Sequence, residues 1–191
     1  MPSRYLFREY SPDWPAQFEE EARAWRALLG DDLLAIHHIG STSVPGLAAK
    51  PTIDLLPLVR SLARIEGATP RLQDAGYKAW GEYGLPGRRY FTKDREDAFR
   101  THNIHVYSFD DPDVERHLAF CAYLRHDAGA RAEYEALKRE AYARHPADIE
   151  AYSSFKEAWI KKTEHIALHW FRRRDARESE QGAGIVPIRN D

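Results

Sequence analysis

The chain has very little cysteine and no long apolar segment. Cys121 is the only cysteine in 191 residues, which excludes an intramolecular disulfide and a zinc site built on several cysteines. No apolar run approaches the roughly 18 residues of a membrane-spanning helix. The first residues, MPSRYLFREY, lack the apolar region of a signal peptide. We therefore expect a cytoplasmic protein that makes no use of a membrane.

An excess of charge of one sign is also missing. The 28 basic and 30 acidic residues give a formal net charge of −2 at pH 7. Proteins dedicated to nucleic-acid binding usually carry a clear positive excess, so this balance argues against that class, although it is weak evidence against a small local patch. A hydrophobic content of 43% and a charged content of 30% are ordinary for a globular protein.

The first half of the chain has the pattern of a helix followed by strands. Ser11 can cap a helix in which Pro12 takes the first position and which Gly30 ends. Its apolar face comprises Trp14, Phe18, Ala22, Trp25 and Leu28. We predict strands over residues 33–39, 52–59, 77–84, 88–94 and 102–109, and a helix from near Ser61 to Gly76.

The second half has helical periodicity throughout. Residues 113–128 and 130–145 each predict a helix, and a third helix follows Pro146. No glycine- or serine-rich linker separates the halves, so we expect the helices to pack on the sheet. We predict one domain over residues 1–172, with a sheet core over about 1–110 and a helical part over about 112–172, and a disordered tail over 173–191.

The segment HHIGSTSVPGLAAKPTIDLL, residues 37–56, carries the candidate site. Glycine and small hydroxyl residues let backbone N–H groups approach a phosphate closely. Asp54 follows on a strand and offers the carboxylate oxygen that a divalent ion prefers, and Lys50 can meet a phosphate as a point charge. The alternative is structural: Gly-Ser is a common turn, and Asp54 can cap a helix or pair with an arginine. The residues alone leave both interpretations open.

The same segment closely resembles the signature of the GrpB family, also called UPF0157. The resemblance continues through GLPGRRYF, HNIHVY, HLAFCAYLR, YEALK and AYSSFKEAWI, and covers roughly Tyr10 to Ala167. It implies membership of the nucleotidyltransferase superfamily and an α+β fold, with a mixed sheet flanked by helices and a helical C-terminal part. It further implies binding of a nucleoside triphosphate with magnesium. Similar domains are fused to dephospho-CoA kinase, which implies a partner enzyme of coenzyme A metabolism.

The superfamily pattern is an apolar residue, Gly-Ser, a spacer and two closely spaced acids, with a third acid on a later strand. Asp54 matches the first acid, whereas Leu56 stands at the second position and His105 at the third. One aspartate and one histidine cannot cage two magnesium ions, but they can hold one metal with help from phosphates and water. Histidine also shifts the preference toward manganese or zinc. Glu82 is a further candidate for the missing oxygen.

The interpretation as a nucleotide-binding site assigns roles to individual residues. Phosphate-binding positions are Gly40, Ser41, Thr42, Ser43, Lys50 and Arg88, and Asp54 is the metal ligand. His105 alternates with Ile104 and Val106, so it faces the side opposite to theirs, where it positions or deprotonates the acceptor.

Four other residues are compatible with a structural or surface role. His38 is as compatible with lining the site as with a structural role, and Cys121 is expected to be an inert core residue. Lys138 and Lys156 are able to face the cleft, although solvated lysines are the simpler expectation.

Three functions are compatible with these residues. The leading hypothesis is a transferase that binds a nucleoside triphosphate with magnesium or manganese, centred on Asp54 and His105, and moves a nucleotidyl group to a small acceptor. The second is a degenerate domain that binds a nucleotide or another phosphorylated ligand, or assists a partner enzyme, without turnover. The third is a plain protein-interaction scaffold.

Overall fold

The structure is a computed structural model that describes residues 6–180. Within them the chain forms one mixed sheet and five α-helices, which confirms the predicted α+β class. In chain order the elements are α1 (Trp14–Leu29), β1 (Leu33–Ile39), β2 (Ile53–Val59), α2 (Leu62–Asp74), β3 (Lys78–Ala79), β4 (Arg89–Asp94), β5 (Arg100–Ser108), α3 (Pro112–His126), α4 (Ala128–Arg144) and α5 (Ile149–Glu180). No helix in this part of the chain combines the length and apolar character needed to cross a membrane.

The strand order places β5 in the middle of the sheet, between β2 and β4. The order is β1-β2-β5-β4-β3, and β2 pairs with β5 in parallel while the other neighbours are antiparallel. Asp54 of β2 is therefore in register with Asn103 of β5 on one side and with Ile39 of β1 on the other. This register brings the Gly-Ser loop that follows β1 next to the polar residues of β5.

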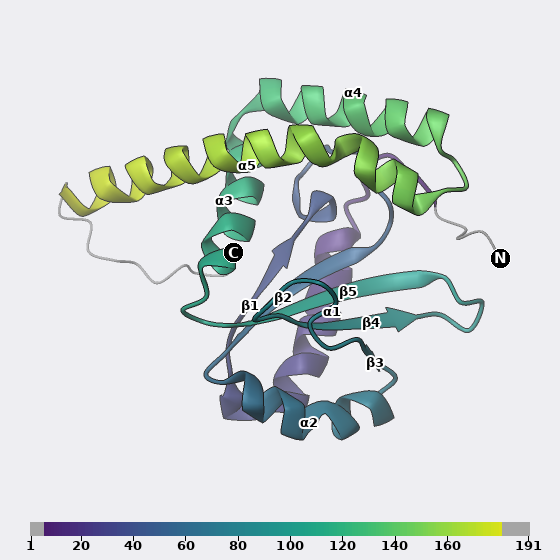
Figure 1. The fold of residues 1–191 in the computed structure, drawn as a ribbon, viewed down its shortest axis with the longest axis vertical. Coiled ribbons are helices and arrows are strands. Elements are labelled where there is room, and N and C mark those ends of the chain that lie inside the picture. Colours follow the sequence, from purple (N-terminus) through teal and green to yellow (C-terminus); the bar gives the residue numbers. More distant parts are fainter. Residues whose placement is uncertain (1–5, 181–191) are drawn as a thin grey trace.

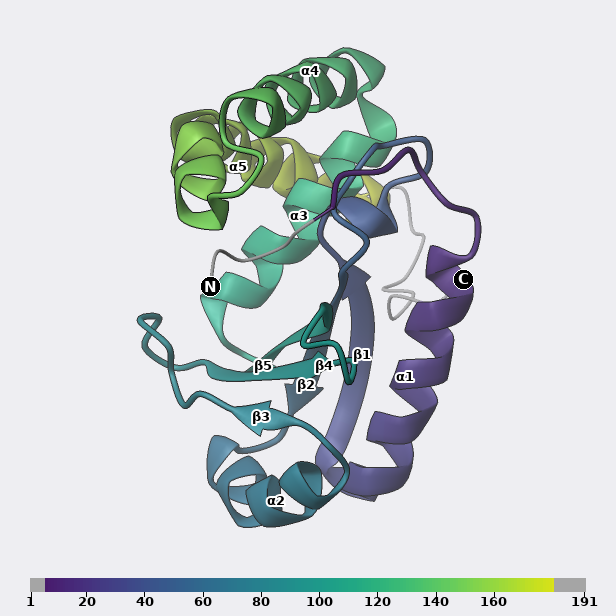
Figure 2. The same cartoon turned by 90° about the vertical axis from the view of Figure 1, so that its right-hand side faces the viewer.

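The two faces of the sheet have different partners. Because side chains alternate along a strand, Ile104 and Val106 face α1 and α2 and belong to the largest apolar cluster, which includes the fully buried Trp25. Tyr107 lies on the opposite face, in a smaller cluster with Leu56 and with side chains of α3. Figure 2 shows α1 running along one face of the sheet.

The helical part is held to the loop between β1 and β2. Helices α4 and α5 lie side by side at one end of the sheet, and α2 lies at the other end (Figure 1). The Nε atom of Arg125 donates to the carbonyl of Ser43 at 3.0 Å, and the amine of Lys138 donates to the carbonyl of Ala48. The loop is therefore clamped between the sheet and the helices.

Several predicted boundaries differ from the structure by a few residues. Helix α1 begins at Trp14, with Asp13 as its N-cap, because the Ser11 hydroxyl accepts from the Asp13 N–H before the helix starts. The strand predicted over 77–84 shrinks to β3, since Gly81 and Gly84 take positive φ and turn the chain.

Helix α5 runs to Glu180, past the predicted end at Arg172. Arg172 forms an ion pair with Glu115 of α3, which helps to hold this extension against the rest of the protein. The remainder of the predicted tail, residues 181–191, lies outside the described residues.

Candidate functional site

Gly40 is required because the carboxylate of Asp54 packs against its backbone. Its dihedral angles, φ 70° and ψ −173°, fall in a region that is essentially restricted to glycine. A Cβ atom at this position would lie 3.0 Å from Cγ of Asp54 and closer still to Oδ2. The loop and the candidate metal ligand are thus in direct contact.

The hydroxyl groups of Thr42 and Ser43 are used within the protein. Thr42 Oγ1 lies 2.9 Å from Nε2 of His38, and Ser43 Oγ donates to the Gly40 carbonyl at 2.8 Å. Both side chains are buried. Of the four predicted phosphate-binding loop residues, the structure leaves Gly40 and the partly exposed Ser41 at the surface of the loop.

Asp54 is the centre of the polar cluster on this face. Its Oδ1 atom accepts a hydrogen bond from Asn103 at 2.8 Å and lies 3.8 Å from Nε2 of His105, and 24% of its side chain is exposed. Asp54 and His105 therefore lie next to each other on the same face of the sheet. Burial alone would raise the pKa of Asp54, but His105, Asn103 and Lys50 together outweigh it and hold the pKa below its ordinary value.

Arg88 sets the orientation of His105. Its Nη1 atom lies 3.3 Å from Nδ1 of His105, and since a guanidinium can only donate, Nδ1 must accept. The proton of a neutral ring then sits on Nε2, facing Asp54. Arg88 is buried and also donates to the carbonyls of Glu82 and Tyr83. Its guanidinium is thus committed to the protein, whereas Arg89 faces away and pairs with Glu66.

The expectation that Lys138 and Lys156 are solvated is wrong. Only 2% of Lys138 and 8% of Lys156 is exposed. The Lys156 amine lies 4.0 Å from the centroid of the Tyr152 ring, and the Lys50 amine lies 5.7 Å from the same centroid. We refer to Lys50, Lys138 and Lys156 as the lysine cluster. Among the described residues, none of the three forms an ion pair with a carboxylate within 4.0 Å.

Burial and mutual repulsion make these amines poor cations. Burial lowers the pKa of Lys156 to about 7, and the positive charge of Lys50 adds to that effect while Asp54 opposes it. Burial, followed by the charge of Lys156, also lowers the pKa of Lys138. The charge of Asp54 acts on all three lysines. An anion that entered here would relieve the repulsion and favour the charged amines.

The spacing of residues along α4 and α5 could have predicted that Lys138 and Lys156 face inward, although charged side chains are usually expected at the surface. Lys138 lies four residues after the buried Tyr134, and Lys156 lies four residues after the buried Tyr152. Each lysine therefore occupies the inward face of its helix.

His38 and Cys121 line the inner side of the loop. The His38 ring stacks on Phe18 with centroids 4.8 Å apart, and burial lowers its pKa to about 4 despite the opposing charge of Asp54. It is therefore neutral and helps to hold the loop. Cys121 is buried next to the Gly40 carbonyl, and burial raises the pKa of its thiol, as expected for an inert core residue.

The protein supplies few metal ligands of its own. The described residues contain no group of three or more histidine, cysteine, aspartate or glutamate side chains able to hold a metal ion. Leu56, at the position of the second acid, is fully buried beneath α3. The Glu82 carboxylate accepts from the Gly87 N–H instead of reaching Asp54. A metal ion here would depend on Asp54 and on oxygens of a bound ligand.

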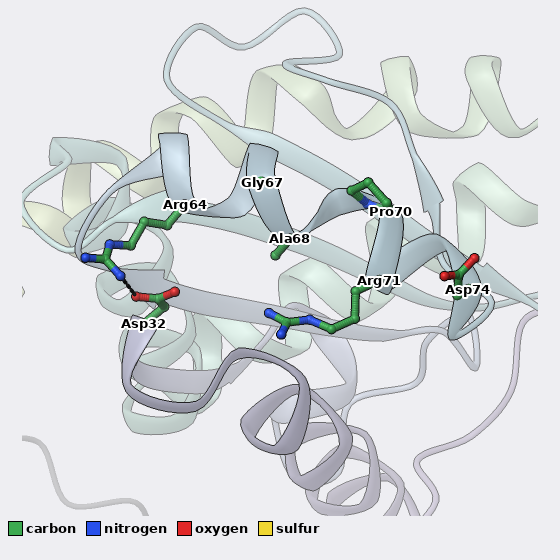
Figure 3. A pocket seen from close by; sticks show the side chains of 7 residues that line it. All are labelled: Asp32, Arg64, Gly67, Ala68, Pro70, Arg71 and Asp74. Carbon is green, nitrogen blue, oxygen red and sulfur yellow. Dashed lines mark hydrogen bonds and ion pairs between the residues drawn. The ribbon is translucent and has the colours of Figure 1, made fainter.

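Two surface hollows lie away from this site. The larger, about 530 Å³, is on α2 at the opposite end of the sheet, where Arg64 and Arg71 extend toward the side on which Asp32 lies (Figure 3). Arg64 already pairs with Asp32 at 2.8 Å. The smaller hollow, about 230 Å³, lies between α4 and α5, beside Trp159.

Comparison with known proteins identifies relatives along most of the chain. The family model described as GrpB protein matches residues 6–165. The UPF0157 protein YqkA of Bacillus subtilis (strain 168) is 42% identical over 161 residues, which cover 84% of this chain and 46% of YqkA. The chain thus matches less than half the length of that relative. A dephospho-CoA kinase of Mycolicibacterium paratuberculosis is 30% identical over 182 residues, covering 83% of this chain and 45% of the kinase.

Solved structures agree with the fold. The crystal structure of conserved protein GrpB from Enterococcus faecalis has a TM-score of 0.82 and 42% sequence identity, and the match covers 87% of this chain and 99% of that chain. A chain in the structure of the GLD-2/RNP-8 complex has a TM-score of 0.51 at 11% identity, with 84% and 58% covered. This second match, at such low identity, shows a similarity of fold alone.

We predict that Gly40→Ala destabilises the protein by about 3 kcal/mol, because it combines a strained backbone with a clash against Asp54. Gly46→Ala is the control, since Gly46 also has positive φ but no atom within 4 Å of an added Cβ; we expect a cost of about 1 kcal/mol there. Urea unfolding measures both. In an Asp54→Ala background the excess cost of Gly40→Ala should shrink; an unchanged excess would mean that the carboxylate is not the obstacle.

A second prediction concerns pH. The pKa of Lys156 is about 7 in the folded protein and 10.5 ordinarily, so between these values the unfolded chain binds a proton that the folded chain has lost. Stability from this group therefore rises with pH from 7 to 10.5, and the penalty is fully present below pH 7. Lys156→Met should raise the free energy of unfolding at pH 7 by about 2–4 kcal/mol and flatten this rise.

The control for the pH prediction is Lys161→Met, because Lys161 lies on the same helix but is exposed and pairs with Glu157. It should change neither the stability nor its pH slope appreciably. Unfolding curves measured from pH 6 to pH 10 test both variants. Equal behaviour of the two variants would contradict a buried, unpaired Lys156.

Proposed function

The chain belongs to the GrpB family, and we propose that it binds the phosphate chain of a nucleoside triphosphate, with one divalent metal ion, between Asp54 and the lysine cluster. The observation that carries this proposal is a group of three amines, the buried Lys138 and Lys156 and the partly buried Lys50, that have no carboxylate partner among the described residues and all feel the charge of Asp54. Buried charge is costly unless it is paired, so such a cluster calls for an anion. Phosphate supplies several negative oxygens at once.

The same residues fit one magnesium or manganese ion. Asn103 occupies only part of the acceptor capacity of Asp54 Oδ1, so the carboxylate retains lone pairs for a metal. Magnesium is commonly bound by one or two carboxylates together with substrate phosphates and water. Gly40 and Ser41 would seat the phosphates beside Asp54 in this arrangement. Arg88 acts indirectly, because it orients His105.

The leading reaction is nucleotidyl transfer to a small acceptor. The oxygen of an acceptor hydroxyl attacks the α-phosphorus and gives its proton to solvent water, the bond from that phosphorus to the bridging oxygen breaks, and pyrophosphate leaves. The Nε2–H tautomer that Arg88 favours makes His105 a hydrogen-bond donor. We therefore assign His105 to holding the acceptor or a phosphate oxygen, and its proton remains in place.

Binding without turnover is the second candidate, and the buried Leu56 favours it. A fully buried leucine at the position of the second acid removes a ligand that a two-metal mechanism requires. In that case the domain would serve as a nucleotide-binding partner of another enzyme. The similarity to a dephospho-CoA kinase makes an enzyme of coenzyme A metabolism our proposed partner. Release of pyrophosphate with candidate acceptors distinguishes transfer from binding alone.

We predict that ATP raises the melting temperature more with magnesium or manganese than without. A ligand at about 100 times its Kd stabilises a protein by about 2.7 kcal/mol, or roughly 5–10 °C for a chain of this size. Asp54→Asn should remove most of the metal-dependent part, and Lys156→Met should weaken the shift produced by ATP alone. Asp74→Asn, an acid at the distant hollow on α2, is the control. A full metal-dependent shift in Asp54→Asn would place the ion elsewhere.

A further inference from the structure

We propose that the exposed aromatic side chains of Trp80 and Tyr83, in the connection between β3 and β4, bind a planar aromatic ring of the acceptor. We call these two side chains the aromatic platform. This inference rests on the proposed function and assigns the chemical class of the second substrate, namely a nucleoside or nucleotide.

The platform exposes rings that a soluble protein usually covers. Tyr83 is 63% exposed and Trp80 is 45% exposed. Their ring centroids are 5.8 Å apart, and the indole N–H of Trp80 is already satisfied by Thr92 Oγ1 at 2.9 Å. The ring of Trp80 is thereby fixed in place, and the two residues present apolar surface that a flat ligand can cover.

The backbone holds Tyr83 in this exposed position. Its φ of 46° is unusual for a bulky residue, and such a strained conformation persists only where the surrounding structure imposes it. Arg88 imposes it by donating to the Tyr83 carbonyl at 2.8 Å and to the Glu82 carbonyl at 3.2 Å. The same guanidinium contacts His105. One buried arginine therefore orients both the platform and the polar site.

A continuous series of rings leads from the platform to Asp54. Tyr83 stacks on Tyr90 with centroids 5.1 Å apart, and the Tyr90 ring lies 5.2 Å from the His105 ring. The Tyr90 hydroxyl donates to Asn103, which in turn donates to Asp54. Tyr90 and His105 therefore connect the platform to the polar cluster around Asp54.

The platform and the lysine cluster approach Asp54 from different sides. Lys50 lies three residues before the start of β2, and Lys138 and Lys156 come from α4 and α5. The platform belongs to the β4 side of β5, across that strand from β2. In phosphoryl-group displacement the attacking and leaving oxygens are roughly in line. If the lysines hold the departing phosphates, the acceptor lies on the side of the platform.

The test compares two ligands that differ only in the ring. Adenosine 5′-monophosphate and ribose 5-phosphate are titrated into the full chain by calorimetry. The wild type should bind the monophosphate about tenfold or more tightly than ribose 5-phosphate, because base stacking on an aromatic side chain contributes that much. Tyr83→Leu should abolish the difference, and Tyr83→Phe should retain it. Phe109→Leu, which removes an exposed aromatic residue elsewhere, is the matched control.

Several outcomes would overturn the proposal. Equal binding of the two ligands by the wild type would do so, as would unchanged binding by Tyr83→Leu. An adenosine tetranucleotide that binds tenfold more tightly than the monophosphate would assign the platform to a nucleic-acid end and reject a small acceptor.

Inorganic tripolyphosphate with magnesium separates this inference from the proposed function. It should stabilise wild type and Tyr83→Leu equally, but not Asp54→Asn. If tripolyphosphate with magnesium did not stabilise the wild type, the proposed phosphate site would be refuted. The comparison of adenosine 5′-monophosphate with ribose 5-phosphate would still decide whether the platform binds a ring.

Discussion

The contact between the Asp54 carboxylate and the Gly40 backbone is the constraint around which the site is arranged. It requires glycine directly after β1, and it holds the backbone of the loop in contact with the side chain of Asp54 on β2. The pairing of β2 with β5 then places Asn103 and His105 next to the same carboxylate. A single aspartate thus connects two strands and a loop, and His105, Asn103 and Lys50 favour its ionised form.

The helical part completes the site by adding charge. Lys138 and Lys156 are carried on the inward faces of α4 and α5, where burial and mutual repulsion destabilise their charged forms. A protein optimised for stability alone would replace such amines with apolar residues. These two lysines are buried near Asp54 although their burial lowers the stability of the protein, and such a loss of stability is typical of functional sites.

Arg88 couples the polar site to the surface. Its guanidinium donates to His105 and to the carbonyls of Glu82 and Tyr83 in the connection between β3 and β4. This explains why a buried guanidinium without a carboxylate partner is tolerated, since each contact is a hydrogen bond to a fixed acceptor. It also explains how Tyr83 keeps its unusual backbone conformation.

The sequence by itself determined the family and, through it, the α+β class, because a long contiguous motif identifies both. Local periodicity determined the positions of most helices and strands. The alternation of side chains along each strand also indicated that Asp54 and His105 lie on the same face of the sheet. It could not determine that Lys138 and Lys156 are buried or that α5 continues to Glu180. The spacing of four residues from Tyr134 and Tyr152 places each lysine on the same helix face as an aromatic ring, but spacing alone does not say whether that face meets water or another helix. Only the packing of α4 and α5 against the loop decides that, because burial depends on residues distant in the chain.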